Sequence, residues 1–544
     1  MEISLLHLLP FSFHSGFRKE PVFISTGGLK CVRCRLKLRF ASKRSCLSST
    51  TVGTEKLESR PTMHDKSNMI MDSDDDFEKN LQDFFVEVKN MLEMGNKNDA
   101  IDLLQANYEM VKEQVESGLE GIEQAALLDV IALGYMGAGE VKLVESLLDM
   151  LDEIMADLHY GNPLMDPILM HMGSMYATLG KFKDAIRVYG RGLEILERQF
   201  GNYSPFLITP LMGMAKGYTS LGKATKALTF YHRAVDILEK NRGVDSEELV
   251  VPLFSLSNVL IKEGKAAEAE ACFSRILDIY TKAYGENNGR VGMAMCSMAH
   301  AVCVEGRVEE AISIYRRGLK VIKESEYMTL DDEVLEKMRM DLAELLHVTG
   351  REHEGRELLQ ESLLITERHK GFDHPSTAVH LVNLAASYSR SKNYVEAERL
   401  LKTSLHIMSK SVGPKDQSIT LPMLHLAVIL YNLNRDEEAE SLAQEVVSIR
   451  ENAFGKESLP VGEALDCLVS IQARLGKDDG DILAKLKRIL RIQEREFGYE
   501  SEDTVITLKK VVFYLDKMGK KDEKMPLDRR LRLLRTKYKE RFPV

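Results

Sequence analysis

The sequence is poor in cysteine, glycine and proline, and it has no long apolar run. Seven cysteines in 544 residues exclude a small disulfide-rich scaffold. Glycine and proline make up about 9% of the chain, against a usual share of roughly 12%, which excludes collagen-like and low-complexity chains. No stretch approaches the ~18 consecutive apolar residues of a transmembrane helix. With 44% hydrophobic and 29% charged residues, the composition is typical of globular proteins.

Motifs of catalysis and cofactor binding are also missing. The chain has no HExxH, no GxSxG elbow and no glycine-rich dinucleotide loop. The segment from Gly217 to Ala224 comes near the phosphate-binding pattern GxxxxGK[ST], but Ala224 replaces the hydroxyl residue and no strand precedes it. Cys31 and Cys34 form a single CxxC without a second pair. We therefore expect no enzymatic activity, no cofactor and no metal.

One group of soft ligands leaves an alternative open. Cys296, His300 and Cys303 are spaced by four and three residues, which places them on one face of a helix. A structural zinc site would need a fourth ligand, and no paired CxxC or HxxxH segment supplies it. Because buried cysteine commonly serves as a small apolar residue, packing is the favoured interpretation. Metal binding or redox sensing, and with it an enzymatic function, is the alternative.

The first 50 residues differ in charge from the rest. They hold two acidic residues and nine basic ones, a local charge of +7, which leaves −17 for the remaining chain. The basic residues are Arg18, Lys19, Lys30, Arg33, Arg35, Lys37, Arg39, Lys43 and Arg44. A basic, serine-rich segment predicts a transit peptide over residues 1–50, and its serine and phenylalanine content favours the chloroplast. A mitochondrial leader, or a cytoplasmic protein with a basic tail, is the alternative.

Charge also bears on the segments that follow. Residues 51–78 contain Pro61 and an acidic run from Asp72 to Asp76, and they are predicted to form a disordered acidic linker. An acidic body repels the phosphates of nucleic acid, so nucleic acid is not an expected partner. A basic stretch from Lys517 to Arg541 is the local exception, and it is interpreted as a solvated capping helix.

From residue 79 to about residue 540 the chain repeats itself at intervals near 42 residues. The segment Leu179–Ala185, for example, recurs as Leu221–Ala227. One position of this segment, here called the anchor, lies between two helical patterns, and its glycine supplies the left-handed cap of the first helix. The anchors are Gly95, Gly139, Gly180, Gly222, Gly264, Gly306, Gly350, Lys392, Asn434, Gly476 and Gly519. They predict about eleven antiparallel helix hairpins.

Small residues recur at fixed distances from the anchor, seven residues before it and five after it. One lies on each helix of a hairpin, so the two backbones can approach closely where they cross. The first set includes Ala132, Gly173, Ala215, Ser257, Ala299, Ala343, Ala385 and Ala427. The second includes Ala100, Ala185, Ala227, Ala269, Ala311, Gly355, Ala397 and Ala439. Bulky residues nine after the anchor share the face of the second helix: Tyr189, Tyr231, Phe273, Tyr315, Leu359 and Leu401.

This pattern resembles the tetratricopeptide repeat, and its long period resembles the kinesin light chain group, most closely from His374 to Glu398. The resemblance implies an all-α, right-handed solenoid of antiparallel helix hairpins that binds proteins or peptides. It also implies that the first helix of each hairpin lines the concave side. Of the asparagines that line the groove in the light-chain group, only Asn383 has a match here.

Counting from the anchors predicts which side chains line that groove. Polar residues of both signs fall there beside Met170, Met212, Phe254 and Met340, a mixture that suits an extended peptide or a helix. The alternative is that some of these side chains only pack against the next hairpin. The predicted groove residues are Lys216, Asn258, Lys262, His300, Glu344, His347, Arg390, Tyr431 and Asn432.

These observations predict a non-catalytic scaffold or assembly factor that binds partner proteins through the groove of its solenoid, in the chloroplast. The alternative is a cytosolic adaptor for cargo or cytoskeleton, related to kinesin light chain, in which the basic segment is only a tail. Self-association of the solenoid is left open.

Overall fold

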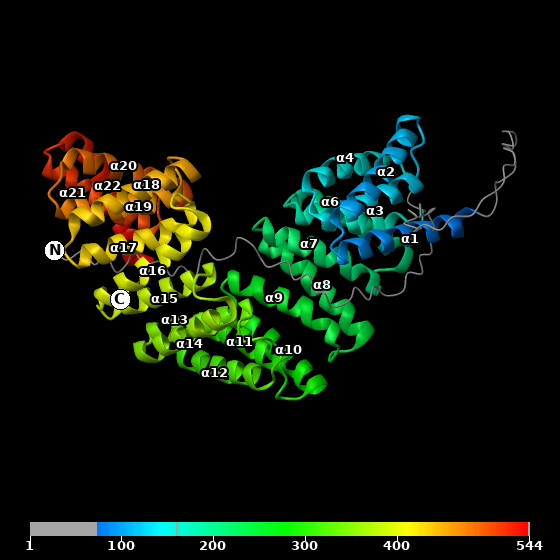
Figure 1. Ribbon diagram of the computed structural model, residues 1–544, viewed down its shortest axis with the longest axis horizontal. Helices are drawn as coiled ribbons and strands as arrows, with labels where there is room; N and C mark the ends of the chain where they lie inside the picture. Colours follow the sequence, from blue (N-terminus) through cyan, green and yellow to red (C-terminus); the bar gives the residue numbers. More distant parts are fainter. Residues whose placement is uncertain (1–72, 159–161, 163, 542–544) are drawn as a thin grey trace, which may run out of the picture. The chain divides into compact units, whose positions relative to one another are not determined.

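The computed structural model describes residues 73–158, 162 and 164–541 (Figure 1). The predicted transit peptide and most of the predicted linker lie outside the described residues. Helix α1 begins at Ser73, so residues 73–78 of the predicted linker are helical. Asp74, Asp75 and Asp76 of the acidic run fall in the first turn of this helix, where negative charge is favourable.

The described chain is all-α, with three short 3-10 helices and no strand. Its contacts divide it into two compact units. The N-terminal unit ends at residue 286 and also includes residues 300–306, which are the end of α11 and the turn after it. Its helices are α1 (Ser73–Glu93), α2 (Lys97–Glu116), α3 (Ile122–Ala138), α4 (Val141–Asp157), α5 (Met165–Thr178), α6 (Phe182–Phe200), α7 (Ile208–Ser220), α8 (Ala224–Arg242), α9 (Val250–Lys262) and α10 (Ala266–Tyr284).

The C-terminal unit comprises residues 287–299 and the described residues from 307 onward. Its helices are α11 (Gly289–Val304), α12 (Val308–Glu324), α13 (Glu333–Val348), α14 (Glu352–Lys370), α15 (Pro375–Arg390), α16 (Tyr394–Val412), α17 (Thr420–Asn432), α18 (Asp436–Phe454), α19 (Leu459–Arg474), α20 (Asp479–Phe497), α21 (Glu502–Lys517) and α22 (Lys521–Arg541). The 3-10 helices are η2 (Pro205–Leu207), η3 (Glu247–Leu249) and η4 (Gln417–Ile419).

Each of the eleven predicted anchors lies between an odd-numbered helix and the even-numbered helix that follows it, and each has a positive φ. At Gly180 the turn is closed by two backbone bonds, Gly180 N to Ala177 O (3.1 Å) and Lys181 N to Tyr176 O (2.9 Å). Lys392 and Asn434 adopt the same left-handed conformation, with φ of 59° and 60°. The predicted hairpins of the solenoid are therefore confirmed.

The small residues on either side of the anchors are buried, as predicted. Ala185, Ala215 and Ala227, for example, have no exposed surface. At Gly355 an added Cβ would lie 2.9 Å from the carbonyl oxygen of Ala343, so the backbones of α13 and α14 touch there. The close crossing of the two helices in a hairpin therefore depends on side-chain size.

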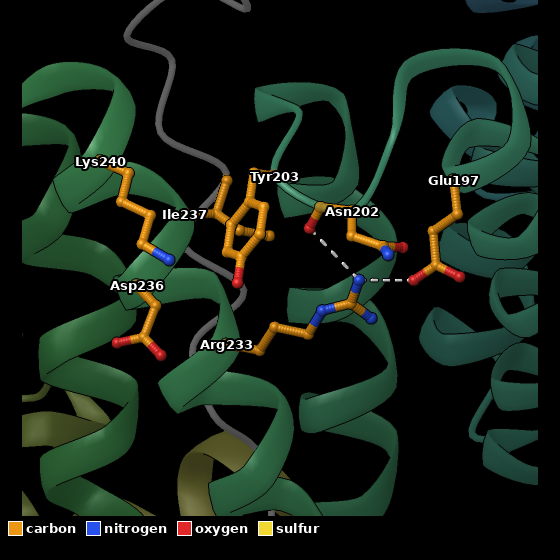
Figure 2. A pocket seen from close by; sticks show the side chains of 7 residues that line it. All are labelled: Glu197, Asn202, Tyr203, Arg233, Asp236, Ile237 and Lys240. Carbon is orange, nitrogen blue, oxygen red and sulfur yellow. Dashed lines mark hydrogen bonds and ion pairs between the residues drawn. The ribbon is translucent and has the colours of Figure 1, made fainter.

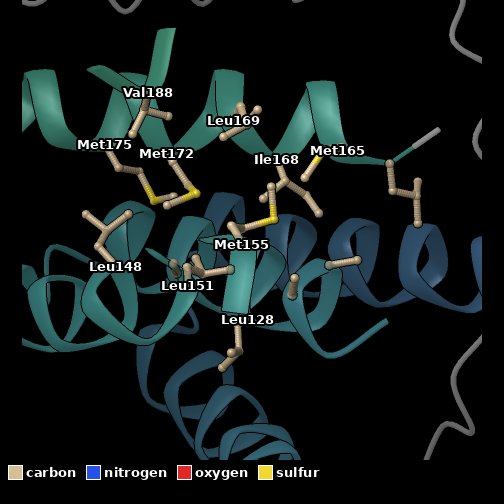
Figure 3. Close-up of a cluster of buried hydrophobic side chains, with 14 of the residues drawn as sticks. Leu128, Leu148, Leu151, Met155, Met165, Ile168, Leu169, Met172, Met175 and Val188 are labelled. Carbon is tan, nitrogen blue, oxygen red and sulfur yellow. The ribbon is translucent and has the colours of Figure 1, made fainter. Parts of the chain in front are cut away.

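Stacking of the hairpins buries a continuous core within each unit. First helices contact the first helix of the next hairpin, as α3 with α5, α5 with α7 and α15 with α17. In the N-terminal unit one apolar cluster extends from Leu81 to Ile237. Figure 3 shows Met155 of α4 pointing toward Met165 and Ile168 of α5, and flexible methionines fill the space between these hairpins.

Candidate functional site

First helices of neighbouring hairpins touch at two fixed positions. The residue ten before the anchor of one hairpin meets the residue nine before the anchor of the next hairpin. Asp129 Oδ2 lies 2.7 Å from His171 Nδ1, and Lys510 Nζ donates to Asp466 Oδ1 at 2.6 Å. Asn383 Nδ2 donates to the sulfur of Met340 at 3.0 Å. These contacts define one side of the first helices, which we call the first-helix surface. The predicted groove residues lie on these helices.

In the N-terminal unit the predicted residues Lys216, Asn258 and Lys262 are exposed. Lys216 and Asn258 occupy the same repeat position, six residues before their anchors, on α7 and α9. Phe254 lies one turn before Asn258 and is 41% exposed. This part of the first-helix surface therefore presents cationic and amide groups beside an aromatic ring. His300, on α11, is half-buried.

Not every methionine near this surface faces outward. Met170 is half-buried, and its terminal methyl fills the space beside Gly192 of α6, where an added Cβ would lie 2.2 Å away. Met170 therefore packs against the second helix of its own hairpin. Met212 and Met340 are half-buried.

In the C-terminal unit the structure brings two predicted residues, Glu344 and Arg390, together. Both carboxylate oxygens of Glu344 accept from Nη2 of Arg390, at 3.2 and 2.9 Å. The two side chains are only 17% and 21% exposed, so little water screens the ion pair. The pair joins α13 to α15 across the first-helix surface.

His347 was predicted to line the groove, and the structure corrects this position. Its side chain is buried, and its ring lies against Gly355 of α14, where an added Cβ would meet Cε1 at 3.0 Å. Burial, and then the guanidinium groups of Arg390 and Arg356, lower the pKa of His347 to about 4. His347 is therefore a neutral packing residue, because its ring fills the space that Gly355 leaves on the partner helix.

The last two predicted residues are half-buried and already engaged. The guanidinium carbon of Arg474, on α19, lies 3.2 Å from the centroid of the Tyr431 ring. The same arginine donates from Nε to Asp436 at 2.8 Å. Asn432 donates from Nδ2 to the carbonyl of Val428 on its own helix at 2.8 Å. At these positions the surface presents an arginine stacked on a tyrosine.

A tyrosine on a second helix also reaches the first-helix surface, which sequence reasoning missed. Tyr189 of α6 lies between two glycines of the neighbouring first helices, Gly173 and Gly213. An added Cβ would lie 2.7 Å from its ring at Gly173 and 2.4 Å from it at Gly213. Burial raises the pKa of Tyr189 to about 12, and its hydroxyl bonds the exposed Ser174. Glycine at both positions was the available signal.

Sequence reasoning also missed a repeated contact on the second helices, in which one arginine bonds a glutamate of the preceding second helix and a loop carbonyl. We call this contact the arginine clasp. Figure 2 shows Arg233 of α8 reaching Glu197 of α6 at 2.5 Å and the carbonyl of Asn202 at 3.4 Å. Arg275 repeats the arrangement with Glu239 (2.5 Å) and the carbonyl of Val244 (3.3 Å). Arg488 and Arg530 do so in the last hairpins, with Glu451 and Glu494. The signal was an arginine eleven or twelve residues after an anchor.

The hollow in Figure 2 lies beside this clasp. Its volume is about 410 Å³, and its lining is Glu197, Asn202, Tyr203, Arg233, Asp236, Ile237 and Lys240. A second hollow of about 410 Å³ lies at the same place in a later hairpin, between the loop at Lys415 and helix α18. A hollow of this kind therefore forms where an inter-hairpin loop crosses the next second helix.

The surroundings of Cys296 bear on the possible metal site at Cys296, His300 and Cys303. Cys296 is buried against Gly318 of α12, and its thiol donates to the carbonyl of Tyr315 at 4.0 Å. Burial, and then the carboxylate of Asp341, raise the pKa of Cys296 to about 12, so the thiol stays protonated at neutral pH. Thiolate is the form that binds metals. In the described part of the chain no three His, Cys, Asp or Glu side chains are grouped to hold a metal ion.

Among the described helices, none is both long and apolar enough to cross a membrane.

Comparison with known proteins identifies the repeats. Residues 165–240, 249–324 and 334–410 match a family model described as tetratricopeptide repeat, and residues 423–459 match a second model of the same description. Two of the similar structures are a putative kinesin light chain with TPR-like repeats from Podosopora anserina and the quorum sensor NprR from B. thuringiensis. The first has a TM-score of 0.34 at 16% identity and covers 37% of this chain and 94% of its own. The second has a TM-score of 0.43 at 14% identity and covers 68% and 99%.

Curated relatives cover a third of the chain. A clustered mitochondria protein homolog of Aspergillus clavatus is 25% identical over 183 residues, which are 34% of this chain and 14% of the relative. A homolog of the same name from Culex quinquefasciatus is 24% identical over 178 residues, 33% of this chain and 13% of the relative. The chain thus spans about one seventh of the length of these relatives.

These relatives contradict the chloroplast prediction, because their name suggests a mitochondrial or cytoplasmic protein. The prediction used only the basic, serine-rich composition of residues 1–50, and such a composition does not distinguish one kind of leader from another. The repeats themselves are found by the family models. The chain contains tetratricopeptide repeats, recognised between residues 165 and 459.

Proposed function

We propose that this protein is a non-catalytic scaffold that binds partner proteins or peptides through its first-helix surface. Tetratricopeptide repeats are protein-interaction modules, and the matched repeats cover residues in both units. The proposal does not include nucleic acid, because the chain outside residues 1–50 carries a net charge of −17. The name of the curated relatives favours a mitochondrial or cytoplasmic setting.

One observation carries the proposal: the chemistry of one position on the first helices varies from hairpin to hairpin, while the positions where the two helices of a hairpin cross vary little. The positions that close each hairpin hold small, buried residues in most of the hairpins. The position six residues before the anchor changes in size, polarity and charge from one hairpin to the next. Its occupants are Lys89, Leu133, Ser174, Lys216, Asn258, His300, Glu344, Ala386, Val428, Ser470 and Phe513. Packing does not require this variety, whereas recognition of an irregular partner does.

The N-terminal unit offers the most accessible part of this surface. Lys216, Asn258 and Lys262 are exposed there, with the half-exposed ring of Phe254 among them. Ammonium groups favour acidic side chains of a partner, an amide can bond its backbone, and the ring can bury an apolar anchor. An extended segment that alternates acidic and apolar residues fits this chemistry.

In the C-terminal unit the predicted residues of this surface are less exposed. Arg390 is held by Glu344, and Tyr431 is covered by Arg474. A partner carboxylate would have to compete with Glu344 for Arg390. We therefore assign the main binding role to Lys216, Asn258 and Lys262, and a secondary one to Glu344, Arg390 and Tyr431.

Reversing the charge of two lysines on the first helices, and of two others on the second helices as a control, tests the proposal. Proximity labelling with the full chain is compared between wild type, K216E/K262E on first helices, and K142E/K183E on second helices. Lys142 and Lys183 are also exposed, and both double variants change the net charge equally. Partners are expected to be lost from K216E/K262E and retained by K142E/K183E. Equal partner profiles for all three proteins would contradict the proposal.

A further inference from the structure

Three aromatic side chains are exposed close together at the loop between α6 and α7. Phe200 ends α6 and is 51% exposed, Tyr203 lies in the loop and is 59% exposed, and Phe206 lies in η2 and is 44% exposed. The ring centroids of Phe200 and Phe206 are 4.8 Å apart. These rings lie at the end of the second helix, away from the residues assigned to partner binding. We call Phe200, Tyr203 and Phe206 the aromatic patch.

Comparison among the hairpins shows that the fold does not require rings at Tyr203 and Phe206, whereas an aromatic residue recurs at the position of Phe200, as Tyr284, Phe454 and Phe497. The loop is counted from the glycine that ends each second helix, here Gly201. Two residues after that glycine, the other hairpins carry Asp245, Asn287, Asp373, Lys415, Glu457 and Glu500 in place of Tyr203. Five residues after it, they carry Glu248, Arg290, Ser376, Ser418, Pro460 and Asp503 in place of Phe206. Only this loop places aromatic residues at both positions.

The loop that carries the patch is held in place by α8 (Figure 2). Arg233 donates to the carbonyl of Asn202 at 3.4 Å, and Asn241 donates to the carbonyl of Tyr203 at 2.8 Å. The ammonium of Lys240 lies 3.7 Å from the centroid of the Tyr203 ring. Side chains held in this way lose little further freedom on binding, and exposed aromatic residues on ordered backbone are typical of interface centres.

Charges beside the patch form a self-complementary pair. Asp236 and Lys240 are both exposed and lie one turn apart on α8. Within the described chain neither of them makes an ion pair. A two-fold axis that passes between them would place Asp236 of one copy opposite Lys240 of the other, and the reverse. Such reciprocal pairing is what an isologous interface requires.

We propose that the aromatic patch, with Asp236 and Lys240, is the two-fold interface of a homodimer. Two reciprocal Asp236–Lys240 ion pairs lie at the two-fold axis and fix the register, and the rings of each copy pack against the other copy beside them. The interface lies on second helices and an inter-hairpin loop, so the dimer leaves Lys216, Asn258 and Lys262 available to partners. It goes beyond the proposed scaffold function.

The size of the patch sets the expected strength. An aromatic side chain carries on the order of 200 Å² of surface, so three half-exposed rings offer roughly 300 Å² per copy. A standard interface buries roughly 800 Å² per partner. The rings therefore supply a core of about a third of a standard interface, and the dimer is expected to dissociate in the micromolar range.

Sedimentation of the full-length chain, from low to high micromolar concentration, tests the proposal. The wild type is expected to approach twice the monomer mass, and Phe206→Ser to weaken dimerisation about tenfold or more. D236K and K240D, which each leave like charges facing across the two-fold axis, should each fail to dimerise. An equimolar mixture of D236K and K240D should recover dimers, because one copy then presents two cations and the other two anions.

Matched changes at the later hollow provide the control. Ser448 and Asn452 occupy the positions of Asp236 and Lys240 on α18, beside a loop without aromatic rings. The S448D/N452K variant should sediment like the wild type. A wild-type chain that stays monomeric throughout the concentration range would overturn the proposal. So would dimerisation that the D236K and K240D changes leave intact, or a mixture of the two that stays monomeric.

Discussion

Replacing Gly213 by alanine should destabilise the contact between α6 and α7 through a single added methyl group. That methyl would lie 2.4 Å from Cε2 and 2.5 Å from Cζ of Tyr189. The ring has no room to retreat, because its other side lies against Gly173. It lies so close that an added Cβ at Gly173 would be 2.7 Å from the ring. Overpacking of this kind costs typically about 1–3 kcal/mol, and the closed space around Tyr189 places the expected cost in the upper half of that range.

The chain itself indicates how the clash is relieved. Where the residue nine after the anchor is leucine, as at Leu359 and Leu401, the facing position of the next first helix holds the larger Asn383 and His425. Of the aromatic residues at this position, Tyr189, Tyr231 and Phe273 face the smaller Gly213, Ser255 and Ser297, and Tyr315 faces Asp341. Tyr189→Leu alone should cost about 1–2 kcal/mol through lost packing. In the Tyr189→Leu background, G213A should cost less than about 1 kcal/mol.

Hydrogen exchange in the full-length chain measures these costs where they arise. A chain of many hairpins does not unfold in two states, so local opening free energies of α6 and α7 are compared rather than a global value. Protection should fall in G213A and be largely restored, relative to Tyr189→Leu, in the double variant. Protection of α6 and α7 in G213A within about 0.5 kcal/mol of wild type would refute the account of this contact.

Three further predictions follow from the structure. Lys392→Gly should raise the local stability of the α15–α16 hairpin by about 0.5–1 kcal/mol, because Lys392 has a left-handed φ of 59°, which glycine adopts at lower cost. A decrease in hydrogen-exchange protection of this hairpin would contradict the prediction. Because the pKa of His347 is lowered, the unfolded chain binds the proton more readily than the folded chain between about pH 6.5 and 4, and the local stability of the α13–α14 hairpin should fall by up to about 3 kcal/mol as the pH drops through that window. His347→Gln should remove this part of the pH dependence of the local opening free energy, measured by hydrogen exchange, and equal slopes in both proteins would argue against it. Arg233→Ala should lower the local opening free energy at the start of α7 by about 1 kcal/mol. Arg316 is more exposed, so Arg316→Ala should change the local opening free energy of its own hairpin by less than about 0.5 kcal/mol. Similar effects at both sites would rule out a structural role for the clasp.

Much of the fold could be predicted from the sequence because it depends on local chemistry repeated many times. Gly180 and the other anchors mark positions where the chain turns into the left-handed region, and Ala185 and Ala215 mark where two helices must touch. Even Lys392 and Asn434 were identified as anchors from spacing alone. The start of α1 at Ser73 was missed because an acidic run is equally typical of a linker and of a helix N-terminus.

The side chains of the site were harder to predict. A repeat position indicates the face of a helix, but not how far the neighbouring hairpin covers that face. Lys216 and Asn258 are exposed at this position, while Ala386 is buried at the equivalent one. His347 lies only three residues after Glu344, yet its ring turns inward against Gly355 because glycine leaves space for it there.

Contacts between hairpins could not be read from spacing at all. The ring of Tyr189 passes between two first helices only because both facing residues are glycine. Arg233 reaches a carboxylate 36 residues earlier in the chain and a loop carbonyl at the same time. Such pairs depend on the distance between stacked hairpins, which a single sequence does not contain.

Lysine footprinting of the protein with a bound partner tests the central claim most directly. The full-length chain, alone and with a partner captured by proximity labelling, is acetylated briefly, and the modification of each lysine is measured by mass spectrometry. Lys216 and Lys262 should be protected by the partner, while Lys142 and Lys183 on second helices should react as they do in the free chain. Protection of Lys142 and Lys183 with Lys216 and Lys262 still reactive would contradict binding at the first-helix surface.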